Sequence, residues 1–136
     1  MSKIFNKKNS VKISMPYLIA EAGVNHEGSL KKAFKLIELA KKGGADAIKF
    51  QTYKAEKLVI KNSPAYWDTK KEKTKNQFDL FKKYDFFEKE DYVKLYRHCK
   101  KKKIDFLSTP FDNEAVEFLN PLVKYFKIAS ADLNNV

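Results

Sequence analysis

Two lysines occupy positions where a β-strand would turn them away from its apolar residues. Residues 45–51 and 125–130 are typical of strands, in which successive side chains point to opposite faces. Lys49 and Lys127 each lie between two apolar residues, so packing of the apolar faces against helices would turn both lysines to the inside of the sheet. A buried ammonium group is costly without a partner. The pattern therefore predicts that an anion, such as a phosphate or carboxylate substrate, holds both lysines.

Other polar residues stand at the ends of the predicted strands, and functional groups of parallel α/β folds gather at the carboxyl ends of strands. The full set is Glu21, Lys49, Gln51, Ser108, Thr109, Lys127, Ser130 and Asp132. A charged or amide group at every strand end is hard to explain by packing, so the set predicts a ligand site. For single members a structural alternative stays open, since Glu21 could simply pair with Lys49 inside the sheet.

The loop that follows the first predicted strand contains Asn25, His26 and Gly28. His26 could bind a metal or act as an acid–base group, but a lone loop histidine is more often a hydrogen-bonded structural residue. The sequence contains no P-loop, G-x-G-x-x-G, Cys-x-x-Cys, H-E-x-x-H or nucleophile elbow. Dinucleotide binding, zinc chemistry and serine hydrolysis therefore have no support.

The elements that would position these residues alternate along the chain. Apolar periodicity and end signals predict strands at 16–21, 45–51, 104–109 and 125–130, with a lead-in strand at 11–13, and helices at 30–42, 78–84, 88–103 and 113–119. Ser29 is the expected N-cap of the first helix, and Gly43 and Gly44 are expected to end it. This alternation predicts an α/β fold with a parallel sheet. Residues 52–85 otherwise form a long loop, which in a compact domain is usually functional.

Composition narrows the possible partners. The 136 residues suffice for one domain, and the net charge of +11 comes almost wholly from lysine, because Arg97 is the only arginine. A lysine-rich solvated surface is therefore favoured over a nucleic-acid-binding face. Cys99 is the only cysteine, which excludes an internal disulfide, and it is expected in the core. No stretch has the length of a signal peptide or a membrane span, so we expect a cytoplasmic protein that binds no membrane.

Four stretches together resemble the sialic acid synthase (N-acetylneuraminate synthase-like) family. They are residues 19–29 (IAEAGVNHEGS), 49–58 (KFQTYKAEKL), 107–112 (LSTPFD), and 127–130 (KIAS) with Asn134 and Asn135. They occur in the family's order and at its spacing, and the similarity runs from Pro16 to the last residue. The combination is far more specific than any one motif.

The resemblance implies a (β/α)8 TIM barrel that condenses phosphoenolpyruvate with an N-acetylated amino-sugar aldehyde, giving a nonulosonic (sialic-type) acid and phosphate. Carried over to this sequence, the catalytic residues are Lys49, Lys127, Asp132 and Glu21, and the substrate-binding residues are Gln51, Thr109, Ser130 and Asn25. The two lysines would grip the phosphate and carboxylate of phosphoenolpyruvate. Gln51 and Thr109 would orient the amino sugar, and Glu21 would help to hold the catalytic layer. A divalent metal, manganese or magnesium, would polarise the aldehyde in the full-length enzyme, which is expected to be a homodimer.

The sequence departs from the family pattern in three respects. Asp132 stands where the family usually has a glutamate, which shortens the side chain by one methylene group. The family's metal-binding histidines lie in later strands, so no metal ligand is expected in this chain, and the ligands are expected beyond Val136. The resemblance also implies a small C-terminal antifreeze-like domain, which we do not expect within residues 1–136. We therefore expect residues 1–136 to be the N-terminal half of the barrel domain and to be inactive alone.

Two other functions stay open. The chain could be a non-catalytic anion-binding module, either a pseudoenzyme fragment or a basic surface that docks on an acidic partner. It could also belong to another phosphoenolpyruvate-using barrel synthase that acts on a sugar phosphate. The last alternative would need an added phosphate pocket, normally rich in arginine, and Arg97 alone cannot form one.

Overall fold

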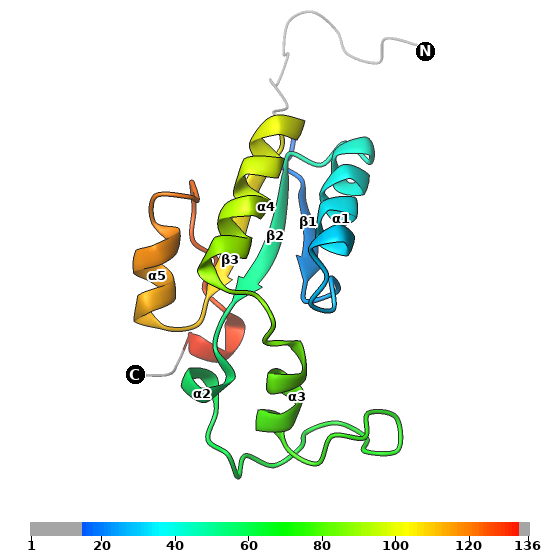
Figure 1. Cartoon of the computed structure of the whole chain (residues 1–136), viewed down its shortest axis with the longest axis vertical. Helices are drawn as coiled ribbons and strands as arrows, with labels where there is room; N and C mark the ends of the chain where they lie inside the picture. The colour runs from blue at the N-terminus through cyan, green and yellow to red at the C-terminus, as the bar shows by residue number, and fades with distance from the viewer. Residues whose placement is uncertain (1–14, 134–136) are drawn as a thin grey trace, which may run out of the picture.

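A three-stranded parallel sheet forms the centre of the protein. The structure is a computed structural model that describes residues 15–133. The strands are β1 (Ile19–Gly23), β2 (Ala47–Thr52) and β3 (Asp105–Pro110), arranged in the order β1-β2-β3 (Figure 1). In the register of the sheet, Lys49 is the neighbour of Glu21 on one side and of Leu107 on the other. Residues opposite one another in neighbouring strands share a face, so these three side chains lie on the same side of the sheet.

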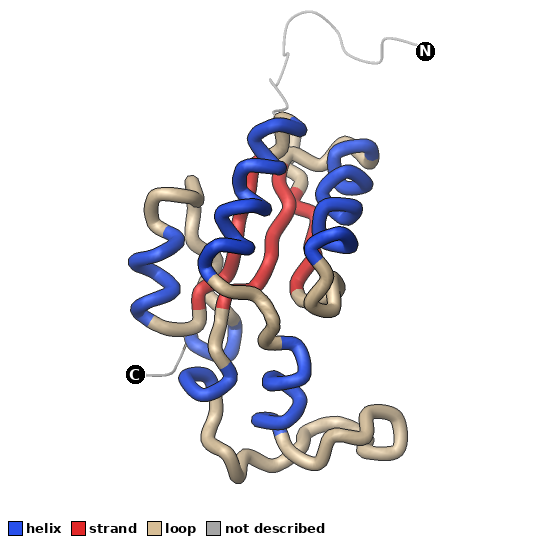
Figure 2. Tube along the Cα trace, in the orientation of Figure 1, coloured by secondary structure: helices blue, strands red, loops and turns tan. Residues whose placement is uncertain are grey.

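Five α-helices and one short 3₁₀-helix accompany the strands. They are α1 (Leu30–Lys42), α2 (Ala55–Leu58), α3 (Gln77–Tyr84), α4 (Lys89–Lys102), α5 (Asn113–Leu119) and η1 (Ser130–Asp132). Helices α1 and α4 lie side by side on one face of the sheet (Figure 2). Helix α3 and the loop before it extend past the carboxyl ends of β1 and β2 (Figure 1). Within the described residues no helix has the length and apolar character to cross a membrane.

The core lies between the sheet and helices α1 and α4. Phe50 and Ile48 of β2, Ile37 of α1, and Leu95 and Cys99 of α4 are all at most 1% exposed. Burying a large apolar side chain of this kind contributes roughly 1.5–3 kcal/mol. The predicted burial of Cys99 is confirmed. Helices α1 and α4 do not cover the opposite face of the sheet, and that face carries the candidate site.

Local signals set the helix ends as predicted. The Ser29 hydroxyl accepts a hydrogen bond from the Lys32 backbone N–H at 3.3 Å, and the Gly43 N–H donates to the Leu39 carbonyl at 2.8 Å. The predicted helices at 30–42 and 113–119 are confirmed with the same bounds. Helix α4 is one residue shorter at each end than predicted, because Glu88 forms the capping box that precedes it and Lys103 adopts the left-handed conformation that ends it.

The first two strands begin later than predicted, and the lead-in strand at 11–13 lies outside the described residues. The Ala45 N–H donates to the Ala40 carbonyl at 3.1 Å, so this residue still belongs to the end of α1. The Asp46 and Ala47 N–H groups both donate to the Leu18 carbonyl, at 2.9 and 3.1 Å, and the strand register starts at Ala47 opposite Ile19. The predicted helix near 78–84 is confirmed as α3, whereas α2 was not predicted.

The predicted fourth strand at 125–130 is wrong. The structure gives residues 125–129 no helix or strand, and Phe126 and Ile128, expected to pack against helices, are 38% and 53% exposed. A strand forms only where a neighbouring backbone offers its hydrogen bonds, and the described sheet contains only β1, β2 and β3. Side chains hold this segment instead. Strand alternation therefore does not set the direction of Lys127.

Candidate anion-binding site

Lys49 sits almost buried on the sheet face opposite the core. Its side chain is only 12% exposed, and its ammonium group forms an ion pair with the Glu21 carboxylate of β1. The same ammonium donates to the Thr109 hydroxyl of β3 at 3.4 Å. Strand register explains both contacts, because Glu21 is the neighbour of Lys49 and Thr109 lies two residues beyond its other neighbour. The pairing that the sequence left open for Glu21 is thus present.

Lys127 lines the same hollow as Lys49 and Glu21. This hollow, of about 370 Å³, lies on that open sheet face and is bounded on its apolar side by Tyr17, Leu107 and other residues. Lys127 itself is exposed, and its ammonium group donates to the neighbouring Ile128 carbonyl. The hollow therefore carries two cations and one carboxylate. Its net charge of +1 suits an anionic ligand.

The structure places the other predicted site residues at different distances from this hollow. Gln51 is half-buried on β2, two residues after Lys49 and hence on the same face, and Thr109 is 3% exposed beside it. Asn25 is exposed in the turn after β1. Ser130 and Asp132 belong to η1 and are not among the residues that line the hollow.

His26 is a buried, neutral side chain. It is 2% exposed, stacks on the Phe87 ring at 4.0 Å between centroids, and accepts a hydrogen bond at Nδ1 from the Gly28 N–H at 3.1 Å. Burial lowers the pKa of His26 to about 4. These contacts favour the structural interpretation of His26 over a metal-binding or acid–base one.

The described residues do not offer a metal site. Within residues 15–133 no group of three or more histidine, cysteine, aspartate and glutamate side chains could hold a metal ion. The divalent metal implied by the family resemblance therefore has no fitting set of ligands in this part of the chain. That its ligands lie beyond Val136 stays a prediction, and Val136 itself lies outside the described residues.

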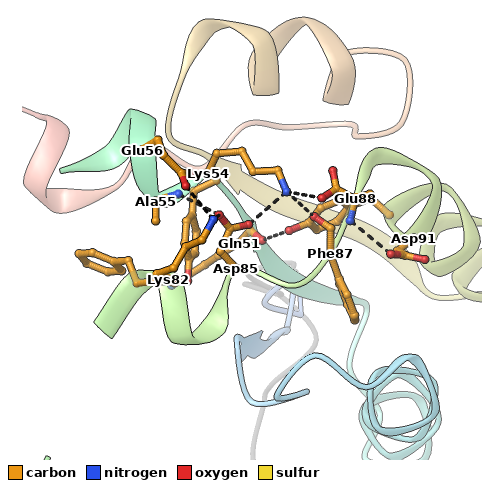
Figure 3. Close-up of polar contacts among 12 residues, drawn as sticks. Gln51, Lys54, Ala55, Glu56, Lys82, Asp85, Phe87, Glu88 and Asp91 are labelled. Carbon is orange, nitrogen blue, oxygen red and sulfur yellow. Dashed lines mark hydrogen bonds and ion pairs between the residues drawn. The ribbon is translucent and has the colours of Figure 1, made fainter. Parts of the chain in front are cut away.

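A buried carboxylate anchors the chain just beyond β2, and sequence reasoning missed it. Asp85 has a side chain only 1% exposed, and its two oxygens accept from the Lys54 ammonium at 3.2 Å and from the Ala55 N–H at 3.0 Å (Figure 3). Lys54 also donates to Glu88 at 2.8 Å and to the Phe87 carbonyl at 3.3 Å. We call Lys54, Ala55 and Asp85 the Asp85 clamp. It ties the start of α2 to the end of α3.

The electrostatics of the Asp85 clamp are favourable. Partial burial lowers the pKa of Lys54, but its hydrogen bonds to Glu88 and Asp85 outweigh this effect and leave the pKa raised. Nearby, the Lys82 ammonium donates to Glu56 at 2.7 Å (Figure 3). The only sequence signal for the clamp is the family-like stretch 49–58, which contains Lys54. Nothing in the sequence indicates that Asp85 is its partner.

Two further hydrogen bonds fix the carboxyl end of β2. The Tyr92 hydroxyl donates to the Gln51 carbonyl at 2.8 Å, and the hydroxyls of Thr52 and Ser108 lie 2.7 Å apart in the interior. Burial raises the pKa of Tyr92, so its phenol stays protonated and keeps its donor. The backbone that carries Lys49 and Gln51 is therefore held from both sides. A site on such a strand is preorganised for a ligand.

Comparison with known proteins gives consistent matches. A model of the NeuB family matches residues 36–136. The N,N'-diacetyllegionaminic acid synthase of Legionella pneumophila is 40% identical over 123 residues, which are 88% of this chain and 34% of that protein. The human N-acetylneuraminate-9-phosphate synthase is 35% identical over 120 residues, which are 88% of this chain and 33% of that protein. The chain thus spans about a third of the length of the curated relatives it matches.

A solved structure supports the fold. The crystal structure of N-acetylneuraminic acid (sialic acid) synthetase from Leptospira borgpetersenii, in complex with citrate, superposes with a TM-score of 0.72 at 36% identity. The superposition covers 88% of this chain and 38% of that one. The predicted α/β fold class, as found in the N-terminal part of such a barrel, is confirmed.

Proposed function

Because this chain belongs to the NeuB family, we propose that it forms the phosphoenolpyruvate-binding part of a nonulosonic (sialic-type) acid synthase. The observation that carries the proposal is that Lys49 and Lys127 line one hollow on the open sheet face. The relatives in the comparison are named as an N,N'-diacetyllegionaminic acid synthase and an N-acetylneuraminate-9-phosphate synthase. The second substrate would accordingly be an N-acetylated amino-sugar aldehyde.

The proposed reaction balances as a condensation. The C2=C3 double bond of phosphoenolpyruvate supplies the electron pair for a new bond between C3 and the aldehyde carbon, and a water oxygen adds at C2. One water proton goes to the former aldehyde oxygen, and the other leaves with the phosphate when the C2–O bond breaks and the C2 carbonyl forms. Negative charge builds on the departing phosphate during this cleavage. Lys49 and Lys127 would stabilise that charge, and Lys49, which Glu21 and Thr109 hold in place, would need little reorganisation as the reaction proceeds. Glu21 would keep the Lys49 ammonium in place through their ion pair.

The remaining roles follow from the family resemblance, since Asn25 is exposed in the turn after β1 and Ser130 and Asp132 do not line the hollow. Gln51 and Thr109 would orient the amino sugar, since both lie close to Lys49. Asn25 and Ser130 would add hydrogen bonds to the substrates, and Asp132 would take part in proton transfer. A divalent metal, manganese or magnesium, would polarise the aldehyde in the full-length enzyme, with ligands outside the residues described here. Homodimerisation of that enzyme and a cytoplasmic location remain predictions.

The experiment that tests the proposal is a calorimetric titration with phosphoenolpyruvate. Lys49→Ala and Lys127→Ala should each weaken binding by about tenfold or more, since each removes a charged hydrogen-bond donor. Lys70→Ala, which removes an exposed lysine in the loop before α3, is the matched control and should bind as tightly as the wild type. Binding to heparin should be the same in all variants.

A different outcome would favour the alternative function. If all three variants bind phosphoenolpyruvate equally, and heparin competes with it, the lysines act only as a diffuse basic surface. The chain would then be a non-catalytic anion-binding fragment.

A further inference from the structure

The segment that carries Lys127 needs an anchor that is not a strand ladder. The described structure gives residues 125–129 no pairing with β3. In a sheet, a slip of one residue turns every side chain to the other face, and the ladder normally prevents it. Without a ladder, side-chain contacts must determine which residue of this segment reaches the hollow.

Asp105, the first residue of β3, provides such contacts. Its Oδ2 atom accepts from the Lys124 ammonium at 2.7 Å and from the Tyr17 hydroxyl at 2.6 Å. Tyr17 in turn meets the ring of Tyr125 edge-on, with centroids 6.5 Å apart and an angle of 82°. One carboxylate thus joins the stretch before β1, the start of β3 and the segment that carries Lys127.

Electrostatics strengthen the contacts of Asp105 with Lys124 and Tyr17. Lys124 and Tyr17 lower the pKa of Asp105 through their hydrogen bonds, so the carboxylate stays charged. Desolvation and the Asp105 carboxylate raise the pKa of Tyr17, so its phenol remains a donor. Asp105 is partly shielded, with a side chain 28% exposed. Its contacts are therefore less screened than those of a fully exposed ion pair.

The spacing relates this anchor to the hollow. Lys127 follows Lys124 by three residues, a distance that backbone can span over at most about 10 Å. Along β3, Leu107 follows Asp105 by two residues and lines the same hollow as Lys127. Asp105 and Lys124 therefore each lie only two or three residues before a residue of their own segment that lines the hollow. Fixing Lys124 at Asp105 leaves little freedom for Lys127.

We propose that Asp105 is a positioning residue that delivers the Lys127 side chain to the phosphoenolpyruvate-binding hollow. This inference rests on the proposed function. Asp105 itself does not line the hollow, and it acts through Lys124.

A double-mutant cycle tests this role with phosphoenolpyruvate as the ligand. Asp105→Asn keeps the shape of the side chain but removes the charge that holds Lys124, and it should weaken binding by about fivefold. In the Lys127→Ala background the same substitution should change binding less than twofold, because the side chain it positions is absent. Asp46→Asn is the matched control and should have no effect. Asp46 lies at the same end of the sheet and accepts from the Leu18 N–H at 2.7 Å, without contact to this segment.

Lys124→Met provides a second route to the same answer if Asp105→Asn unfolds, as judged by circular dichroism. It should weaken binding to the same extent and only when Lys127 is present. If these substitutions weaken phosphoenolpyruvate binding equally with and without Lys127, Asp105 and Lys124 act on the fold alone. If Asp105→Asn and Lys124→Met both bind as tightly as the wild type, the positioning role is also overturned. If Lys127→Ala itself binds as tightly as the wild type, the proposed function fails, which is a separate outcome.

Discussion

The buried imidazole of His26 should make this protein less stable as the pH falls from 7 to 5. Its pKa is about 4 in the folded protein, compared with 6.5 in an unfolded chain. Between pH 4 and pH 6.5, His26 is mostly protonated in the unfolded state and mostly neutral in the folded state. Stability from this group is therefore complete above pH 6.5 and is lost progressively as the pH drops toward 4.

The size of the effect follows from the two pKa values. Each pKa unit corresponds to about 1.4 kcal/mol, so the full shift from 6.5 to about 4 is worth about 3 kcal/mol. At pH 5 the unfolded imidazole is almost fully protonated, whereas the folded one is still mostly neutral. The linked loss between pH 7 and pH 5 is then about 2 kcal/mol.

Urea unfolding at pH 7 and pH 5 measures this loss. His26→Gln removes the titrating group, so its stability should fall by about 2 kcal/mol less than that of the wild type over this range. His98→Gln, which removes the other histidine, is measured alongside, so that an effect specific to His26 is separated from the loss of any histidine. The reasoning is refuted if wild type and His26→Gln lose the same stability, or if NMR titration finds a His26 pKa near 6.5.

Two further predictions concern stability, measured by chemical denaturation. Asp85→Ala should lower the free energy of unfolding by about 2 kcal/mol, because it leaves the Ala55 N–H without its acceptor and removes one of the three acceptors of the Lys54 ammonium. Glu88→Ala, which removes an exposed partner of the same ammonium and the capping-box carboxylate of α4, should cost about 1 kcal/mol. Gly28→Ala should cost more than Gly44→Ala. Both glycines have positive φ, 73° and 84°, but a Cβ atom at Gly28 would lie 2.6 Å from the Phe86 ring, whereas one at Gly44 would meet nothing within 4 Å.

Two results would contradict these expectations. Equal losses for Asp85→Ala and Glu88→Ala would show that burial of the carboxylate is unimportant. Equal losses for Gly28→Ala and Gly44→Ala would show that the Phe86 ring moves aside without cost.

Sequence reasoning succeeded where the determining contacts are local. Ser29 caps α1 through a residue three positions away, and Gly43 ends the helix through one four positions away. Both signals are visible in the sequence itself. The face of β2 that carries Lys49 also follows from simple alternation, because parallel pairing on both sides keeps that strand regular.

Sequence reasoning failed where the structure of a segment depends on residues far away in the sequence. The alternation around Phe126 predicts a strand, but no pattern in one segment shows whether another backbone is available to pair with it. The Asp85 clamp joins residues about thirty positions apart in a stretch with no periodicity. The link between Asp105 and Lys124 is equally invisible in the sequence. The sequence nevertheless predicts one site for Lys127 and Lys49, although the strand on which that prediction depends does not form.

The most direct test is a crystal structure of this protein with phosphoenolpyruvate bound. We predict that the ligand occupies the hollow on the open sheet face, with the Lys49 and Lys127 ammonium groups each within about 3 Å of an anionic oxygen. A ligand bound elsewhere on the protein, or one that contacts Lys49 while the Lys127 ammonium remains in solvent, would contradict the account.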